Sequence, residues 1–185
     1  MRWVVATDPV SEPITVAEVK EYSAIDYTTH DTLISTMITA TRQAIEKWLG
    51  RALITQTIEA YLDYISYGEI VLPCPPFATL NSFQVRQFDG TTDDIDSDGY
   101  YVSDTVNPAV ITIHGTSIPT TDRERGGYVI NFDAGYGDST DVPDGIKLGL
   151  LAATADAYEN RIVPREPVDK AKQLLNSYRN ARYLI

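Results

Sequence analysis

The sequence has few residues of the kinds that build metal centres and cross-links. Its 185 residues include a single cysteine, Cys74, and two histidines, His30 and His114. One cysteine excludes an internal disulfide and a multi-cysteine zinc site, so its simplest role is that of a small buried apolar residue. The histidines are not spaced as the pairs that metal hydrolases use, and we predict no metal site from them.

Long hydrophobic runs are also absent from the sequence. No run reaches the roughly 18 apolar residues that a membrane-spanning helix needs, so no contact with a membrane is predicted. The five apolar residues that follow Arg2 within the first ten positions are too few for the core of a secretory leader. We therefore expect synthesis in the cytoplasm.

Motifs of catalysis and phosphate binding are missing as well. The stretch Gly135-Tyr136-Gly137-Asp138 is short and acidic and lacks the lysine of a P-loop, so we interpret it as a turn between a strand and a helix. Nothing resembles a Gly-x-Ser-x-Gly elbow. We predict no catalytic residue and no cofactor, and keep a small hydrolase with an unrecognised site as a remote alternative.

One acidic segment partly matches a calcium-binding loop. Residues Asp94 to Gly99 fit the first six positions of an EF-hand loop, but the twelfth position holds Thr105 instead of glutamate. The flanking residues favour strands, not helices. We expect an acidic hairpin turn here, and the sequence leaves open whether Asp94, Asp96 and Asp98 bind calcium weakly.

The net charge of −11 is distributed unevenly. The stretch from Arg161 to Ile185 holds six basic and two acidic side chains, so the rest of the chain is strongly acidic. An acidic body repels the phosphates of DNA. The basic end fits an acidic protein partner or nucleic acid, or is a solvated helix face whose cations favour the helix C-terminus.

Four helices are predicted, two on each side of a strand-rich middle. Thr15 and Glu18 have the spacing of a capping box that begins a helix over residues 16–22. Two adjacent apolar stripes predict a helix over residues 31–49, which ends at Gly50. Further helices are predicted over residues 143–161 and 167–181.

Two glycines in the third predicted helix indicate close helix packing. Gly145 and Gly149 lie four residues apart and permit a neighbouring helix to approach. Each costs about 1 kcal/mol relative to alanine in a helix interior, so a packing gain should offset them.

Residues 53–133 alternate between β-branched or aromatic residues and turn signals, which predicts a series of strands. The fold class expected is α+β, with a small helical bundle formed by the two chain ends and a β-rich insertion over residues 53–133. We expect one domain over residues 1–185, with a C-terminal tail over residues 179–185.

Three ordered stretches resemble the head–tail connector (adaptor, or head-completion) proteins of tailed bacteriophages. They are Pro13-Ile14-Thr15-Val16-Ala17-Glu18-Val19-Lys20 with the helix ending at Trp48-Leu49-Gly50-Arg51, then Leu72-Pro73-Cys74-Pro75-Pro76-Phe77, then Gly135-Tyr136-Gly137 followed by Val142-Pro143 and Tyr158-Glu159-Asn160-Arg161. Together they span most of residues 13–161. The last 24 residues match less well.

The resemblance implies a structural virion protein in the neck, not an enzyme. It implies a homo-oligomeric ring of roughly twelve copies, bound to the portal protein and to a downstream neck or tail protein. DNA would pass through the channel without specific binding. Another ring component, such as a stopper or tail terminator, is the alternative within the same class of proteins.

We select two sets of candidate site residues on these grounds. The candidate subunit interface comprises Met37, Thr41, Trp48, Gly145 and Gly149. The candidate portal-docking tail comprises Lys170, Lys172, Arg179, Arg182, Tyr183, Leu184 and Ile185.

Overall fold

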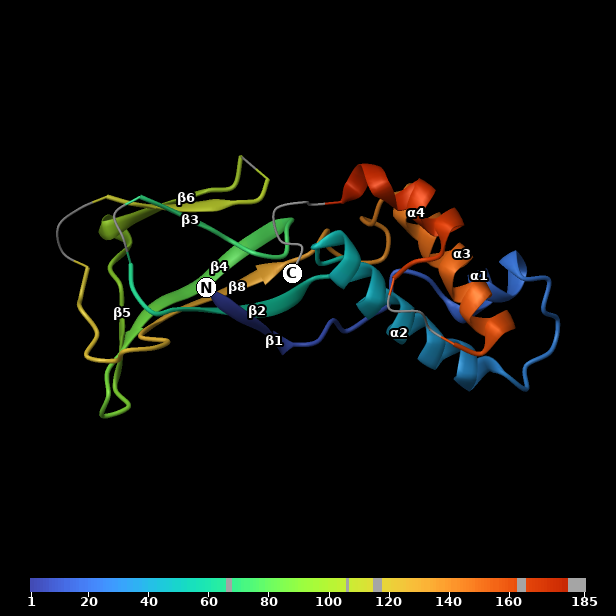
Figure 1. Cartoon of the computed structure of the whole chain (residues 1–185), viewed down its shortest axis with the longest axis horizontal. Helices are drawn as coiled ribbons and strands as arrows, with labels where there is room; N and C mark the ends of the chain where they lie inside the picture. Colours follow the sequence, from blue (N-terminus) through green and yellow to red (C-terminus); the bar gives the residue numbers. More distant parts are fainter. Residues whose placement is uncertain (66–67, 106, 115–117, 163–165, 180–185) are drawn as a thin grey trace. The chain divides into compact units, whose positions relative to one another are not determined.

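Helices and strands lie in separate units of the chain (Figure 1). The computed structural model describes residues 1–65, 68–105, 107–114, 118–162 and 166–179. The strand unit comprises Met1–Pro9 and Thr55–Gly135, and the helical unit comprises Val10–Ile54 and Tyr136–Ile185. The α+β fold class, with a β-rich insertion between two helical stretches, is confirmed.

The helical unit holds four α-helices. They are α1 (Val16–Tyr22), α2 (Asp31–Leu49), α3 (Asp144–Asn160) and α4 (Asp169–Leu175), the last continued by a 3₁₀ turn over Asn176–Tyr178. Helix α3 packs against α1, α2 and α4. Within the described residues α4 is shorter than the predicted helix over residues 167–181, whose last two positions lie outside them. Its regular turns end before Asn176 and Ser177, residue types whose side chains compete with helical backbone hydrogen bonds.

Helix α1 begins at the predicted capping box. The Glu18 amide donates to Thr15 Oγ1 at 3.2 Å, and the Thr15 amide donates to Glu18 Oε2 at 2.6 Å. Ile14 and Val19, on either side of the cap, are both buried as a hydrophobic staple requires. Helix α2 ends at Gly50, whose φ of 65° is the left-handed conformation that glycine adopts freely.

The core of the helical unit is aliphatic. Its fully buried members include Val19 of α1 and residues of α2, α3, α4 and the segment after α2: Ile34, Ile38, Ile45, Leu49, Leu53, Ile146, Leu150 and Leu175. The two stripes predicted on α2 therefore face other helices of the same chain to a large extent.

The strand unit contains two antiparallel sheets. A five-stranded sheet has the order β1-β2-β8-β4-β5, and a three-stranded sheet has the order β3-β7-β6. The strands are β1 (Arg2–Thr7), β2 (Gln56–Leu62), β3 (Glu69–Val71), β4 (Phe77–Arg86), β5 (Thr92–Asp94), β6 (Tyr100–Ser103), β7 (Val110–Ile113) and β8 (Tyr128–Ala134). Strand β8 lies at the centre of the larger sheet and is buried along most of its length.

Two edge strands were not predicted. Strand β1 pairs with β2 across a long sequence separation, so the first nine residues join the strand unit. Strand β5, which is Thr-Asp-Asp, pairs with β4 after the predicted turn at Asp89-Gly90.

The expected hairpin turn at Asp94–Gly99 is wrong. Asp94 ends β5 in one sheet, and the 3₁₀ turn over Ser97–Gly99 leads into β6 in the other sheet. Asp96 caps this turn by accepting from the Asp98 amide at 3.1 Å. The segment is thus a crossing between sheets, which local turn signals do not distinguish from a hairpin.

Candidate functional site

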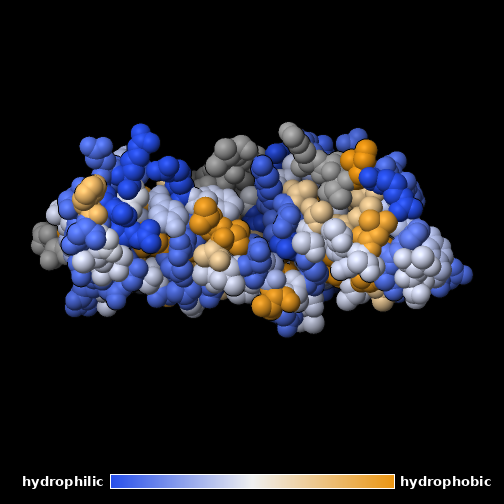
Figure 2. All heavy atoms as spheres, turned by 90° about the horizontal axis from the view of Figure 1, so that it is seen from below, coloured by the Kyte–Doolittle hydropathy of each residue, from blue (hydrophilic) through white to orange (hydrophobic). Residues whose placement is uncertain are grey.

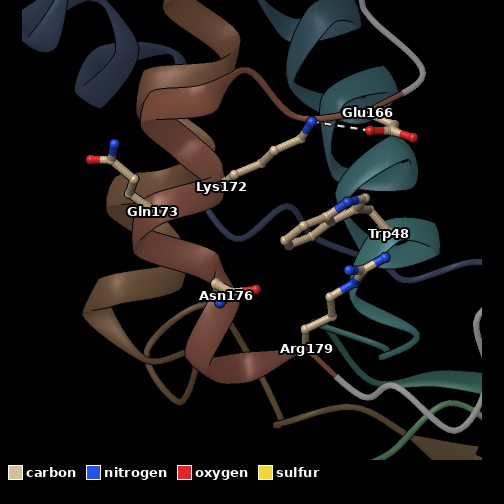
Figure 3. A pocket seen from close by; sticks show the side chains of 6 residues that line it. All are labelled: Trp48, Glu166, Lys172, Gln173, Asn176 and Arg179. Carbon is tan, nitrogen blue, oxygen red and sulfur yellow. Dashed lines mark hydrogen bonds and ion pairs between the residues drawn. The ribbon is translucent and has the colours of Figure 1, made fainter.

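A groove of about 600 Å³ lies in the helical unit between the end of α2 and α4 (Figure 3). We call it the Trp48 groove. Its lining residues are Trp48, Glu166, Lys172, Gln173, Asn176 and Arg179. The groove is open to solvent.

Trp48 contributes an aromatic face to this groove. The indole is half-buried near the C-terminus of α2, and the guanidinium carbon of Arg179 lies 4.6 Å from the ring centroid. Such a cation–π contact stabilises by roughly 0.5–1 kcal/mol at an exposed site. Arg51 Nε donates to the carbonyl of Tyr178, which fixes the backbone just before Arg179.

Lys172 supplies the second cation of the groove. Its Nζ lies 3.0 Å from Glu166 Oε2 and 4.0 Å from Asp169 Oδ1. Both carboxylates are mostly exposed, with 69% and 98% of their side-chain surface accessible. Exposed pairs of this kind contribute about 0–1 kcal/mol, so an incoming carboxylate can exchange with Glu166 at little cost.

The groove is rich in hydrogen-bond donors. Lys172, Asn176 and Arg179 point to the side of α4 that faces Trp48, whereas Gln173 points away from it (Figure 3). Ammonium, amide and guanidinium groups donate to carboxylate oxygens. The arrangement of these donors is suited to binding an acidic group.

The structure brings together residues from both predicted sets. Trp48, taken from the candidate subunit interface, meets Lys172 and Arg179 from the candidate docking tail. Lys170 is exposed on α4 but does not line the groove. The remaining members of the tail set lie outside the described residues: Arg182, Tyr183, Leu184 and Ile185.

The other candidate interface residues face the interior of the helical unit. Met37 and Thr41 are buried, with 8% and 3% of their surface exposed. A Cβ on Gly149 would lie 2.7 Å from the Leu175 side chain, and one on Gly145 would lie 2.8 Å from the Tyr178 hydroxyl. The predicted close approach of a helix is confirmed, with α4 of the same chain as the neighbour. A role in a subunit interface stays a prediction.

Strand β1 is a surface feature that sequence reasoning missed. Trp3, Val4 and Val5 expose 38%, 50% and 40% of their surface at the edge of the larger sheet. Figure 2 shows a patch of exposed apolar atoms on the strand unit. The sequence has consecutive apolar residues before Asp8-Pro9. Because they do not alternate with polar residues, this pattern did not predict a half-buried strand.

A buried ion-pair network around Arg42 was also missed. Arg42 is 4% exposed, and it donates from Nε to Glu12 Oε2 and from Nη1 to Glu46 Oε2, both at 2.7 Å. Glu46 Oε1 accepts from the Leu53 amide at 2.8 Å. Burial raises the pKa of Glu46, and the Arg42 guanidinium acts against that rise. The network fastens the segments before α1 and after α2 to α2 itself.

The Tyr-Glu-Asn-Arg end of α3 has a packing role. Tyr158 Oη lies 2.6 Å from His30 Nδ1 and 2.8 Å from Tyr27 Oη. The Arg161 guanidinium carbon lies 4.8 Å from the Tyr158 ring centroid. These contacts join the end of α3 to the start of α2 and engage His30 in a structural cluster.

Metal and membrane features were searched over the part of the chain that the structure describes. Within it, no three His, Cys, Asp or Glu side chains are grouped so that they could hold a metal ion. No described helix has the length and apolar character needed to span a membrane.

Comparison with known proteins gives one family match and several structural neighbours. The model of the family described as "Head completion protein" matches residues 12–155. No curated protein matches the sequence significantly. Three solved structures share the fold at 21% sequence identity, each covering 100% of this chain and 98% of the matched chain.

These structural neighbours all come from gene transfer agent (GTA) particles. The TM-score is 0.83 for a chain of the neck of an empty GTA particle computed with C6 symmetry and 0.83 for a chain of the native GTA virion. It is 0.81 for a chain of the neck of a native GTA particle computed with C12 symmetry. At this level of identity the likeness establishes the shared fold.

Proposed function

Because this chain belongs to the head completion protein family, we propose that it is a structural subunit of the neck of a phage-like particle, at the junction of head and tail. The observation that carries the proposal is the family match over residues 12–155, which takes in helices α1 and α2, the β-rich insertion and most of α3. The resemblance to head–tail connectors drawn from the sequence motifs is confirmed by this match.

A closed ring is the proposed form of the protein. Its structural neighbours come from necks computed with cyclic symmetry, and we carry a ring of roughly twelve copies over to this chain. We propose that both units act together as one connector subunit. The exposed apolar strand β1 supports a role in assembly, since soluble monomers rarely leave such an edge uncovered.

The charge distribution supports passage of DNA through the ring. Residues 1–9 and 55–135, the strand unit, carry thirteen acidic and four basic side chains. Each neutralised phosphate adds to the affinity for DNA, so an acidic channel lets DNA slide without binding. A stopper or tail-terminator ring remains the second candidate within this class, and the position of the subunit in the particle separates the two.

Docking to the portal is assigned to the basic end of the chain. Arg179 follows the 3₁₀ turn at the end of α4, and its guanidinium lies over the Trp48 ring. Deleting Arg179 to Ile185 should weaken binding to the isolated portal ring at least tenfold, as measured by isothermal titration calorimetry. The melting temperature should fall by only a few degrees, because the contact of Arg179 with Trp48 contributes about 0.5–1 kcal/mol.

A matched control keeps the tail length and removes charge elsewhere. Arg125, exposed in the strand unit, is changed to Ser in the full-length chain, and this variant should bind the portal like the wild type. If the truncated chain unfolds, or binds the portal as the full chain does, the docking role of this end is refuted.

A further inference from the structure

The Trp48 groove presents two cations whose partners within the chain are weak. Lys172 pairs with exposed carboxylates, and Arg179 lies on the indole face of Trp48. A guanidinium in contact with a ring through its face still carries N–H donors for a carboxylate. Lys172 and Arg179 are both among the residues that line the groove. The groove therefore favours an acidic segment.

The same chain carries a segment of matching charge in its strand unit. Between Gln87 and Asp122 the sequence has seven aspartates and neither lysine nor arginine. Four of them lie on residues 93–98, which we call the acidic segment, and all four are exposed: Asp93, Asp94, Asp96 and Asp98.

The acidic segment has a fixed backbone that can enter a groove. Asp93 and Asp94 belong to β5, the outermost strand of its sheet, and the Asp96 carboxylate caps the following 3₁₀ turn. Ile95 between them is buried, with 4% of its surface exposed, which anchors the segment to the strand unit. An anchored segment loses less conformational entropy on binding than a free loop does.

Two different, complementary surfaces on one chain are what a cyclic ring requires. In a head-to-tail assembly each subunit presents one surface to the neighbour on one side and the other surface to the neighbour on the opposite side. We propose that the Trp48 groove of one subunit receives the acidic segment of a second copy, with Asp93 and Asp98 pairing with Lys172 and Arg179. This inference rests on the proposed ring and names the contact that closes it.

Charge reversal with rescue tests the contact. The groove variant carries Lys172→Glu and Arg179→Glu, and the segment variant carries Asp93→Lys and Asp98→Lys. Self-association of the full-length chain is measured by sedimentation velocity and native mass spectrometry over a wide range of concentrations, at low and high salt. Each variant alone should associate at least tenfold more weakly than the wild type, and the wild-type association should weaken as salt rises.

The decisive sample is the mixture of the two variants. In an equimolar mixture the two variants can alternate, so that a reversed groove meets a reversed segment at one contact and a wild-type groove meets a wild-type segment at the next. Both contacts are attractive. Paired complexes containing one copy of each variant should therefore form at a strength that neither variant reaches alone. The control variant, Arg125→Glu with Lys147→Glu, has the same change in net charge at positions outside the groove and should associate like the wild type. Circular dichroism and melting temperatures establish that every variant is folded.

Three results would overturn the proposed contact: a wild-type chain that stays monomeric at all concentrations, variants that associate like the wild type, or a mixture without paired complexes. The proposed function is tested separately, by incorporation into particles. A groove variant that assembles normally into necks refutes the contact and leaves the neck role standing, whereas absence of the wild-type chain from necks refutes the neck role itself.

Discussion

At the scale of single residues, Gly149 controls how closely α3 and α4 approach. A Cβ at this position would lie 2.7 Å from both Cγ and Cδ2 of Leu175. Leu175 is fully buried, so its side chain has little room to move aside. The helix-propensity cost of glycine, about 1 kcal/mol, is thus offset by contact with a buried leucine of the neighbouring helix.

Replacing Gly149 by valine should lower the free energy of unfolding by about 1–3 kcal/mol, the usual cost of overpacking a core. Urea denaturation followed by circular dichroism measures the change. Leu148→Val is the matched control, because Leu148 is the preceding residue of the same helix and is 43% exposed. Equal stability of the two variants would show that α4 does not pack closely on Gly149.

Individual residues of the Trp48 groove could be selected from the sequence, but their proximity to one another in the fold could not be predicted. The basic side chains Lys172 and Arg179 were selected for charge, and Trp48 was selected for its place on an apolar stripe. Their common groove depends on how α2 and α4, which are more than a hundred residues apart in the sequence, both pack against α3. Arg42 could not be found, because a single arginine within an apolar stripe carries no sequence signal of burial.

At the scale of elements, the ion pairs of Arg42 attach the segments before α1 and after α2 to α2 itself. Arg42→Ala should destabilise the protein by about 3–5 kcal/mol at neutral pH, because it removes the guanidinium that pairs at 2.7 Å with the largely buried Glu46 carboxylate. Adding Glu46→Gln to the variant should recover part of that loss, since a neutral amide costs less to bury. Chemical denaturation of the single and double variants provides the comparison.

The deficit of Arg42→Ala should depend on pH with a defined sign. Burial already raises the pKa of Glu46 in the folded protein, and loss of the guanidinium raises that pKa further. A carboxyl whose folded pKa exceeds its unfolded value of about 4.3 holds its proton better when folded, so stability falls as pH rises between the two values. The deficit should therefore shrink toward pH 4. A deficit that is constant between pH 4 and 7 would contradict this account of Glu46.

Element boundaries were predictable where local chemistry sets them. The Thr15 cap and Gly50 fixed the start of α1 and the end of α2, and the Asp89-Gly90 turn lies between β4 and β5 as expected. Strands β1 and β5 escaped prediction, because their pairing with β2 and β4 satisfies the backbone without a buried face that would leave an alternating pattern.

At the scale of the whole molecule, the two units of the chain differ in net charge. The strand unit is strongly acidic, whereas Lys172 and Arg179 of the helical unit line the Trp48 groove. This difference gives one chain both an acidic surface for the proposed DNA channel and a complementary pair of surfaces for a neighbour. Both uses require copies of the chain to be arranged around an axis.

The most direct test of the central claim is a cryo-EM reconstruction of the particles that contain this chain, with the chain carrying a bound antibody fragment as a marker. The proposed function predicts marker density at the head–tail junction, on a closed ring of cyclic symmetry. Marker density on the capsid shell or along the tail tube, or particles with complete necks that lack the chain, would contradict it.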